Sequence, residues 1–143
     1  MMKKESFINL MILLGILALD RLAKYVLVDS CFGIFCIKTA FNNGASFGIL
    51  PGTTPFLIVV ASFVLVLMAY FYSKVDGKTK LAFTLIGAGT LGNLADRIFF
   101  GGVIDLFSIL NSSSFNVADM SNLAGGIILL YVIFGSKKKS LKK

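Results

Sequence analysis

Charged side chains are scarce in this chain: they make up only 15% of its 143 residues, whereas apolar residues make up 57%. Soluble domains carry about a quarter of their residues as charged side chains, so this composition excludes the soluble class. The chain also lacks a low-complexity linker and a convincing internal repeat. We therefore expect a single domain, residues 1–143, embedded in a lipid bilayer.

Four runs of mostly apolar residues are long enough to cross the hydrocarbon core of a bilayer, which takes roughly 20 residues of helix. These runs should be helical, because lipid offers unpaired backbone groups no partner. They cover residues 7–28, 55–72, 81–100 and 115–134. The predicted fold class is an all-α membrane protein with a bundle of four transmembrane helices.

Basic residues are nearly absent from the loops 29–54 and 101–114, where Lys38 stands alone. They gather instead before the first span, between the second and third, and after the fourth: Lys3, Lys4, Lys74, Lys78, Lys80, Lys137, Lys138, Lys139, Lys142 and Lys143. The positive-inside rule therefore places both termini in the cytoplasm and the two loops outside. Topology and anionic headgroups explain the net charge of +7, so no nucleic-acid partner is expected.

The first apolar run is expected to be a retained anchor and not a cleaved signal peptide. It is longer than the apolar region of a signal peptide, it contains Asp20 and Lys24, and three further spans follow it.

Both outer loops contain stretches rich in β-branched and aromatic residues, at 31–40 and 103–107, which predict a small extracytoplasmic β-sheet. Cys31 and Cys36 lie in the first of these stretches. A disulfide between them is expected if the compartment is oxidising, and two free thiols are an equally valid interpretation.

Charged side chains within the spans lie towards their outer ends, and an ionised group buried in a bilayer calls for a reason. Asp20 and Lys24 have i, i+4 spacing, so they should pair on one helical face and are interpreted as structural. Asn93 and Arg97 share this spacing, and Arg97 is expected to neutralise a carboxylate. Glycines that should let helices approach closely are found at positions 87, 89, 92, 125 and 126.

Asp105 and Asp119 differ from Asp20 and Asp96, because no basic residue lies within four positions of either. Both should lie at the outer mouth of the bundle. Two carboxylates in a low-dielectric site cannot both ionise cheaply, so such a pair shares one proton. An aspartic protease uses this arrangement, with one member activating water and the other polarising the scissile carbonyl. Two solvated interfacial aspartates are the alternative that spacing alone leaves open.

Taken together, five segments of the chain resemble blocks of the signal peptidase II family, the lipoprotein signal peptidases. Asp20-Arg21-Leu22-Ala23-Lys24 resembles the first-helix block, and Asn42-Asn43-Gly44-Ala45-Ser46-Phe47 resembles a conserved loop of that family. Gly92-Asn93-Leu94-Ala95-Asp96-Arg97 is similar to its third-helix block. Val103-Ile104-Asp105 and Phe115-Asn116-Val117-Ala118-Asp119 resemble the two blocks that hold its catalytic aspartates.

The resemblance implies an aspartic endopeptidase of the cytoplasmic membrane that cuts diacylglyceryl-modified prolipoproteins just before the lipidated cysteine. It implies no cofactor and no metal, and the small sheet corresponds to the family's extramembrane cradle. We expect a monomer whose partners are this substrate and the membrane lipids. Catalysis is assigned to Asp105 and Asp119. Substrate binding or support of the dyad is assigned to Asn42, Asn93, Arg97 and Asn116, and a structural role to Asp20, Lys24 and Asp96.

Two other classes of function compete with this interpretation. A small ion or solute transporter would use the buried polar residues as a pathway, but such a pathway needs polar groups through the full thickness, and the inner halves of these spans are almost wholly apolar. A non-enzymatic scaffold explains the glycines and leaves the aspartate pair unexplained. The proximity of Asp119 to a helix N-terminus suggests that it is the base of the dyad.

Overall fold

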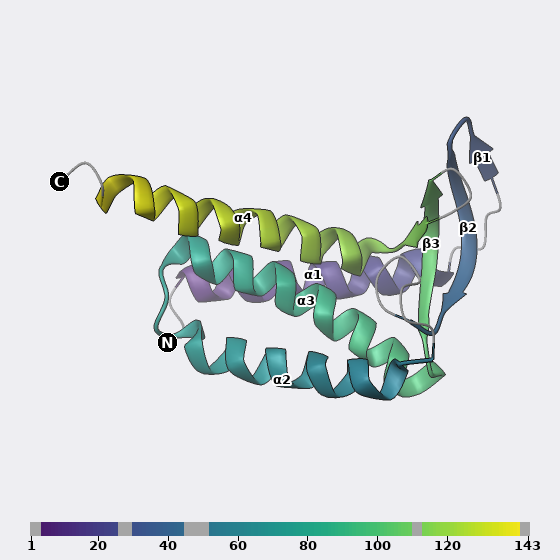
Figure 1. Cartoon of the computed structure of the whole chain (residues 1–143), viewed down its shortest axis with the longest axis horizontal. Helices are drawn as coiled ribbons and strands as arrows, with labels where there is room; N and C mark the ends of the chain where they lie inside the picture. The colour runs from purple at the N-terminus through teal and green to yellow at the C-terminus, as the bar shows by residue number, and fades with distance from the viewer. Residues whose placement is uncertain (1–3, 26–29, 45–51, 110–112, 141–143) are drawn as a thin grey trace.

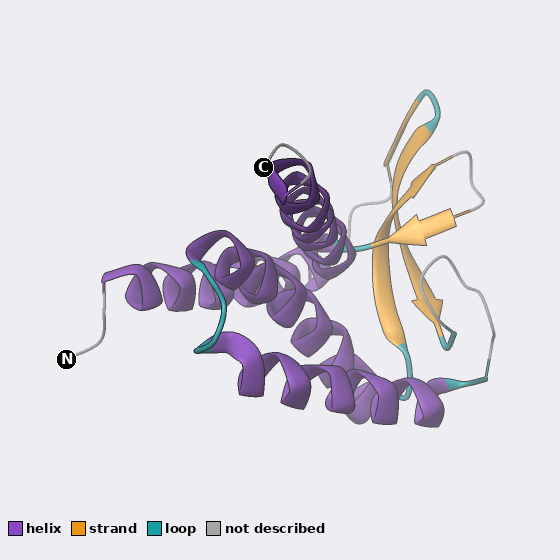
Figure 2. Ribbon diagram, turned by 60° about the vertical axis from the view of Figure 1, so that its left-hand side comes forward, coloured by secondary structure: helices purple, strands orange, loops and turns teal. Residues whose placement is uncertain are grey.

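The computed structural model describes residues 4–25, 30–44, 52–109 and 113–140. Its four helices are α1 (Lys4–Tyr25), α2 (Thr54–Tyr72), α3 (Gly77–Phe100) and α4 (Val117–Ser140). Its four strands are β1 (Ser30–Phe32), β2 (Phe35–Asn42), β3 (Val103–Ile109) and β4 (Ser113–Phe115). The helices run alongside one another, and the strands gather at one end of them, here called the sheet end (Figures 1 and 2).

The helices follow the apolar runs of the sequence closely, with small differences at their ends. Residues 26–28 of the predicted first span lie outside the described part of the chain. The fourth helix begins at Val117 and not at residue 115, because Phe115 belongs to β4 and pairs with Phe107. The predicted start was wrong because apolar character alone does not distinguish a strand residue from the first turn of a helix.

Three helices are long and apolar enough to cross a membrane: α1, α2 and the part of α4 up to Gly135. Their outward-facing apolar side chains are largely exposed, as at Leu22 (63%), Phe63 (62%) and Leu123 (66%). Such surfaces are expected to face lipid. The chain is therefore mostly helical and has the character of a membrane protein.

The remaining helix, α3, contacts each of the other three and forms the centre of the bundle. Its buried residues are mostly small or polar: Ala82, Thr84, Gly87, Ala88, Gly89, Gly92, Asn93, Leu94 and Asp96. The small and polar residues of this buried face explain why α3 is not among the helices that are apolar enough to cross a membrane by composition alone.

Small residues let α3 and α4 approach closely. A Cβ atom built at Gly89 would collide with the carbonyl oxygen of Ala118, and one at Gly125 would lie 2.7 Å from Ile86 Cγ1. The Ser121 hydroxyl also donates a hydrogen bond of 2.8 Å to the carbonyl of Leu85. The predicted packing role of these glycines is therefore confirmed for the α3–α4 contact.

The ends of α3 have well-formed caps. At its start the Asp76 side chain accepts a hydrogen bond of 2.8 Å from the backbone N–H of Thr79. At its end Gly101 adopts a left-handed conformation (φ 75°), and its N–H donates to the carbonyl of Arg97. This turn directs the chain straight into β3, which places β3 directly over the end of the bundle.

The strands form one antiparallel sheet in the order β1-β2-β3-β4, as the β-rich character of the outer loops predicted. Cys31 and Cys36 face each other across the β1–β2 hairpin and are joined by a disulfide bond. The disulfide decides between the two interpretations that the sequence left open for these cysteines.

Candidate active site

Asp105 lies in the middle of β3 with none of its surface exposed. Its strand partner is Ala40 of β2, and Asn42 lies two residues further along β2, so all three share one face of the sheet. The Asn42 amide donates a hydrogen bond of 3.2 Å to Oδ2 of Asp105. Ser114 Oγ donates a second bond of 3.2 Å to the same oxygen.

Asp119 lies in the first turn of α4 and is held by two donors. The Asn93 side chain of α3 donates to its Oδ1 at 2.9 Å, and the backbone N–H of Asn116 donates to its Oδ2 at 3.3 Å. The Asn93 contact explains why that residue is buried on α3 at the level of the α4 N-terminus.

Asn116 connects the two carboxyl groups. Its Nδ2 donates to Asp105 Oδ1 at 2.8 Å, while its Oδ1 accepts from the backbone N–H of Asp119 at 2.9 Å. The same Nδ2 also lies 3.1 Å from Asn93 Oδ1. Asn116 is completely buried, so its hydrogen bonds are shielded from water. The structure thus brings the two aspartates that spacing alone singled out onto one asparagine side chain.

A second polar cluster contains the other two buried aspartates, and here cations neutralise them. Lys24 Nζ lies 2.6 Å from Asp20 Oδ2 and 2.8 Å from Asp96 Oδ2, and Arg21 Nη1 lies 2.9 Å from Asp96 Oδ1. The ion pair predicted from the i, i+4 spacing of Asp20 and Lys24 is therefore present. Asp20 Oδ1 also accepts from the backbone N–H of Ala118, which ties α1 to the start of α4.

Arg97 contacts backbone carbonyls and makes no direct ion pair within the described residues. Its Nη2 donates to the carbonyl of Gly44 at 3.0 Å, and its Nη1 lies 3.4 Å from the carbonyl of Asn93. Arg97 was expected to neutralise a carboxylate, and its guanidinium lies near enough to Asp119, Asp105 and Asp96 to attract them electrostatically without a direct ion pair. Its guanidinium also attaches the segment after β2 to α3, next to Asn42, whose Oδ1 accepts from the Gly44 N–H at 2.9 Å. Residues 45–47 of the predicted loop motif lie outside the described part of the chain.

Two residues of these clusters were missed by sequence reasoning. Ser114 was assigned only to a loop, and its contact with Asp105 depends on the pairing of β4 with β3. Arg21 was located in a span without a partner, although it lies next to Asp20 in the sequence and across from Asp96 in the fold. Neither contact could be predicted from the residues next to Ser114 or Arg21 in the sequence.

Burial controls the protonation of Asp105. Removal from water raises the pKa of this carboxyl group above its usual value. The hydrogen bonds from Asn42, Ser114 and Asn116 act in the opposite direction and partly offset the effect. Asp105 therefore retains a proton to a higher pH than an ordinary aspartate does.

The arrangement offers two carboxyl groups with a shared hydrogen-bonding partner and, among the described residues, no cation in direct contact. Such a pair can hold one proton between two acids, which is the requirement for general acid–base activation of water. Among the residues that the structure describes, no group of three or more His, Cys, Asp or Glu side chains is placed to hold a metal ion.

Comparison with known proteins identifies the group to which the chain is related. The model of a family described as signal peptidase (SPase) II matches residues 12–135. The chain belongs to the signal peptidase II family. All the polar residues of the two clusters described in this section lie within the matched range.

Several proteins called lipoprotein signal peptidase are similar to this member of the signal peptidase II family over most of their length. The one from Staphylococcus carnosus is 34% identical, and the match covers 97% of this chain and 99% of the relative. The one from Halothermothrix orenii is 33% identical, with coverages of 89% and 95%. The one from Clostridium acetobutylicum is 35% identical, with 87% of each chain covered.

Solved structures agree with this relationship. A structure described as a bacterial membrane enzyme superimposes with a TM-score of 0.84 at 27% identity, covering 94% of this chain and 91% of that one. A second structure with the same description gives a TM-score of 0.77 at 26% identity, with coverages of 87% and 91%. The helices and the small sheet are therefore the fold of a known type of membrane enzyme.

Proposed function

We propose that this chain is an aspartic endopeptidase that removes the signal peptide from diacylglyceryl-modified prolipoproteins by cutting before the lipidated cysteine. Asp105 and Asp119 are the proposed catalytic pair. The observation that carries the proposal is the contrast between two pairs of aspartates. Asp20 and Asp96 contact cations, whereas the described contacts of the Asp105 and Asp119 carboxyl groups are with neutral donors. Asn116 joins the pair, since its side chain donates to Asp105 and its backbone N–H donates to Asp119.

The proposed reaction needs one ionised and one protonated carboxyl group. The ionised member takes a proton from a water molecule, which attacks the carbonyl carbon of the scissile bond. The protonated member donates its proton towards the carbonyl oxygen, and a tetrahedral intermediate forms. Collapse of this intermediate breaks the C–N bond and returns a proton to the departing amine.

We assign the ionised role to Asp119 and the protonated role to Asp105. Asp119 lies in the first turn of α4, where the helix dipole favours a negative charge, and it accepts hydrogen bonds from Asn93 and Asn116. Asp105 lies in a strand, where no helix dipole favours its ionised form. A titration in which Asp105 is the more acidic member would overturn this assignment.

The other polar residues are proposed to position the pair or the substrate. Asn116 and Asn93 fix the orientation of both carboxyl groups through the contacts described above. Arg97 and Asn42 both hold Gly44, so they are proposed to shape the peptide-binding side of the site. Asp20, Lys24 and Asp96 are proposed to hold α1 and α3 together below the pair.

The position of the site suits a membrane-anchored substrate. The candidate pair lies where the sheet meets the ends of α3 and α4, and the helices that lead to it expose apolar surfaces. A signal helix packed alongside the bundle would bring its cleavage site to this level while its acyl chains stay in lipid. Binding energy from these remote parts would orient the peptide bond at the aspartates.

The proposal includes a topology. We take α3 as the fourth crossing of the cytoplasmic membrane, with both termini in the cytoplasm, the sheet outside, and residues 1–143 acting as one domain and a monomer. The support is that α3 lies among three apolar helices and is 24 residues long. The start of α1 and the end of α4 lie at the same end of the bundle, away from the sheet (Figure 1).

A transporter function has less support. A solute pathway needs polar groups along its whole length, whereas the polar clusters of this protein gather at the sheet end. In the opposite half, the cavity between α1, α2 and α3 is lined mostly by apolar side chains.

The decisive experiment measures cleavage of a diacylglyceryl-modified prolipoprotein and of its unlipidated form by the purified protein. Asp105→Asn and Asp119→Asn should each lower kcat by a factor of about 10² or more, the typical contribution of a general acid or base. Asp76→Asn makes the same chemical change at an exposed helix cap, where asparagine also caps well, and should leave kcat unchanged.

Correct folding of each variant is checked by thermal unfolding in detergent. Cleavage of only the lipidated substrate, lost in both dyad variants, supports the proposal. If either folded dyad variant cuts as fast as Asp76→Asn, the catalytic assignment is wrong, and if the wild type cuts neither substrate, the peptidase function itself is wrong.

A further inference from the structure

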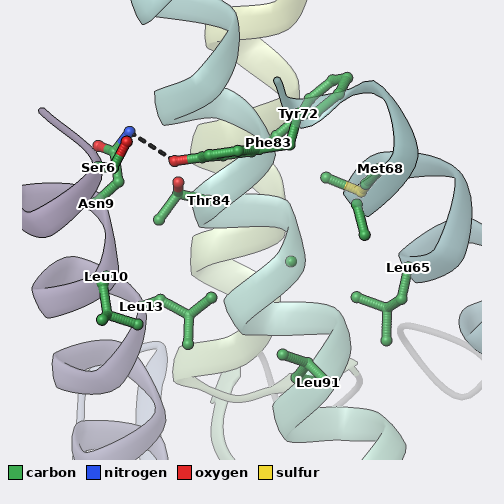
Figure 3. A pocket seen from close by; sticks show the side chains of 12 residues that line it. Ser6, Asn9, Leu10, Leu13, Leu65, Met68, Tyr72, Phe83, Thr84 and Leu91 are labelled. Atoms are coloured by element: carbon green, nitrogen blue, oxygen red, sulfur yellow. Dashed lines mark hydrogen bonds between the residues drawn. The ribbon is translucent and has the colours of Figure 1, made fainter. Parts of the chain in front are cut away.

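A cavity of about 480 Å³ lies in the half of the bundle away from the sheet. It is bounded by α1, α2 and α3, and because α1 and α2 meet mainly through α3, a space remains between them. Figure 3 shows side chains from the three helices converging on this space: Leu10 and Leu13 from α1, Leu65 and Met68 from α2, and Leu91 from α3. None of these residues belongs to the candidate active site.

The cavity has an apolar body and one polar end. The polar end is formed by Asn9 and Tyr72, whose side chains are joined by a hydrogen bond of 3.0 Å, with Ser6 and Thr84 beside them (Figure 3). Leu65 and Leu91 lie at the other end, towards the sheet. The shape is therefore that of a slot parallel to the helices, with its polar end where α2 finishes and α3 begins.

Basic residues lie near this polar end. Lys80 precedes Thr84 by one helical turn, and its side chain lies 3.9 Å from the carboxylate of Glu5. Lys74 follows Tyr72 by two residues, and its Nζ lies 3.6 Å from the centroid of the Tyr70 ring. Lys78 faces α4 instead of the cavity, since its Nζ lies 5.7 Å from the ring of Tyr131. Together with Lys4, these cations outnumber the two acidic residues of the same region, Glu5 and Asp76.

We propose that this slot binds an anionic phospholipid, with one acyl chain in the cavity and its headgroup against Lys80. An acyl chain matches the apolar walls of a slot between membrane-spanning helices, and basic pockets between such helices recognise anionic headgroups. The site is separate from Asp105 and Asp119, so the lipid is a structural or regulatory ligand and not the substrate.

A substrate signal helix fits this slot less well. Signal peptides begin with a positively charged segment, which would meet the lysines at the polar end. Like charges at a contact oppose binding, whereas a phosphate headgroup is attracted. This step of the argument rests on the proposed function, but the lipid site itself does not.

Gly87 provides a direct test, because it lines the cavity and a Cβ atom built there would meet nothing within 4 Å. Gly87→Leu should fill the slot without displacing a neighbour, and leucine also favours the helix over glycine. Gly126→Leu is the matched control: a Cβ atom at Gly126 also meets nothing within 4 Å, but this glycine lies on α4, outside the cavity. Gly87→Ala, a smaller step, gives an intermediate point.

Binding is measured by native mass spectrometry of the full chain in detergent, titrated with phosphatidylglycerol or with phosphatidylcholine of identical acyl chains. The wild type should prefer phosphatidylglycerol. Gly87→Leu should weaken binding of this lipid at least tenfold relative to Gly126→Leu, with Gly87→Ala between them. Lys80→Gln should weaken it by about fivefold and abolish the preference, whereas Lys78→Gln, at a lysine whose side chain faces α4, should change neither.

Equal binding by the Gly87→Leu and Gly126→Leu variants would overturn the cavity as the site, and equal binding of the two lipids by the wild type would overturn headgroup recognition. Displacement of the lipid by a synthetic prolipoprotein signal peptide would assign the slot to the substrate instead. Each titration is made without substrate, so its result is independent of whether the protein cleaves prolipoproteins.

Discussion

At the scale of single residues, the buried aspartates of this protein divide by their partners. Asp96 is fully buried and contacts both Lys24 and Arg21, so its charge is compensated. Asp105 is equally buried, but its described partners are the neutral side chains of Asn42, Ser114 and Asn116. Burial without a cation stabilises a bound proton, whereas burial between cations stabilises the charge.

The pH dependence of cleavage should reflect this difference. Because burial raises the pKa of Asp105, its proton is lost only when the pH rises through that raised value, so activity should fall on the alkaline side of the profile. Ser114→Ala removes a hydrogen bond that favours the ionised form, and the alkaline limb should then move to higher pH by about one unit.

The profile of kcat/KM against pH for the two proteins measures this effect. A shift of the alkaline limb to lower pH in Ser114→Ala would contradict the account of Asp105. Thermal unfolding at each pH separates loss of activity from loss of fold.

At the scale of elements, α1 and α3 are joined through a buried ion cluster. The side chains of Lys24, Asp20 and Asp96 are each no more than 2% exposed. Lys24→Met keeps the volume of the side chain but leaves two carboxylates without their shared cation, and should cost about 3 to 5 kcal/mol of unfolding free energy.

Lys80→Met is the matched control, because its partner Glu5 is 48% exposed and 3.9 Å away. Loss of such a surface pair should cost about 1 kcal/mol or less. Chemical denaturation of both variants in detergent provides the comparison, and a Lys24→Met protein as stable as Lys80→Met would show that the cluster does not hold these helices together.

The contact between α3 and α4 depends on the absence of a side chain at Gly89. Gly89→Ala should push the helices apart, because its Cβ would meet the carbonyl of Ala118 and the side chain of Asn122, and should destabilise the protein by about 1 to 3 kcal/mol. Gly126→Ala on α4 meets no neighbour and should stabilise by up to about 1 kcal/mol, since alanine favours a helix over glycine.

Opposite signs of these two changes in thermal unfolding are the expected result. Equal changes would mean that the helices adjust freely at Gly89. Because Asp119 lies in the first turn of α4, we also expect Gly89→Ala to lower kcat by a larger factor than it raises KM.

At the scale of the whole molecule, the proposed topology makes α3 a membrane crossing although it is not among the helices that are apolar enough to cross a membrane by composition alone. Four crossings place the two chain ends on one side of the membrane, whereas three would place them on opposite sides. Reporter fusions at residue 76 and at the C-terminus should both report the cytoplasm, and a fusion at residue 102 should report the outside. A C-terminal fusion that reports the outside would contradict four crossings.

Much of the fold could be predicted from local sequence features. The lengths of the apolar runs predicted all four helices, and β-branched and aromatic residues predicted the strands around residues 31–40 and 103–107. The start of α4 was misplaced because Phe115 suits a strand and a helix equally well in isolation. For the candidate site, the sequence singled out Asp105 and Asp119, since neither has a basic residue nearby along the chain.

What the sequence by itself determined is therefore whatever depends on neighbours along the chain: membrane-length helices, the pairing of Asp20 with Lys24, and the absence of cations beside two aspartates. Only the tertiary structure decided which distant groups meet. Lys24 reaches Asp96 across 72 positions, and Ser114 reaches Asp105 only because β4 pairs with β3. Such contacts depend on how helices and strands pack in space. The number of residues between two positions does not tell whether their side chains meet.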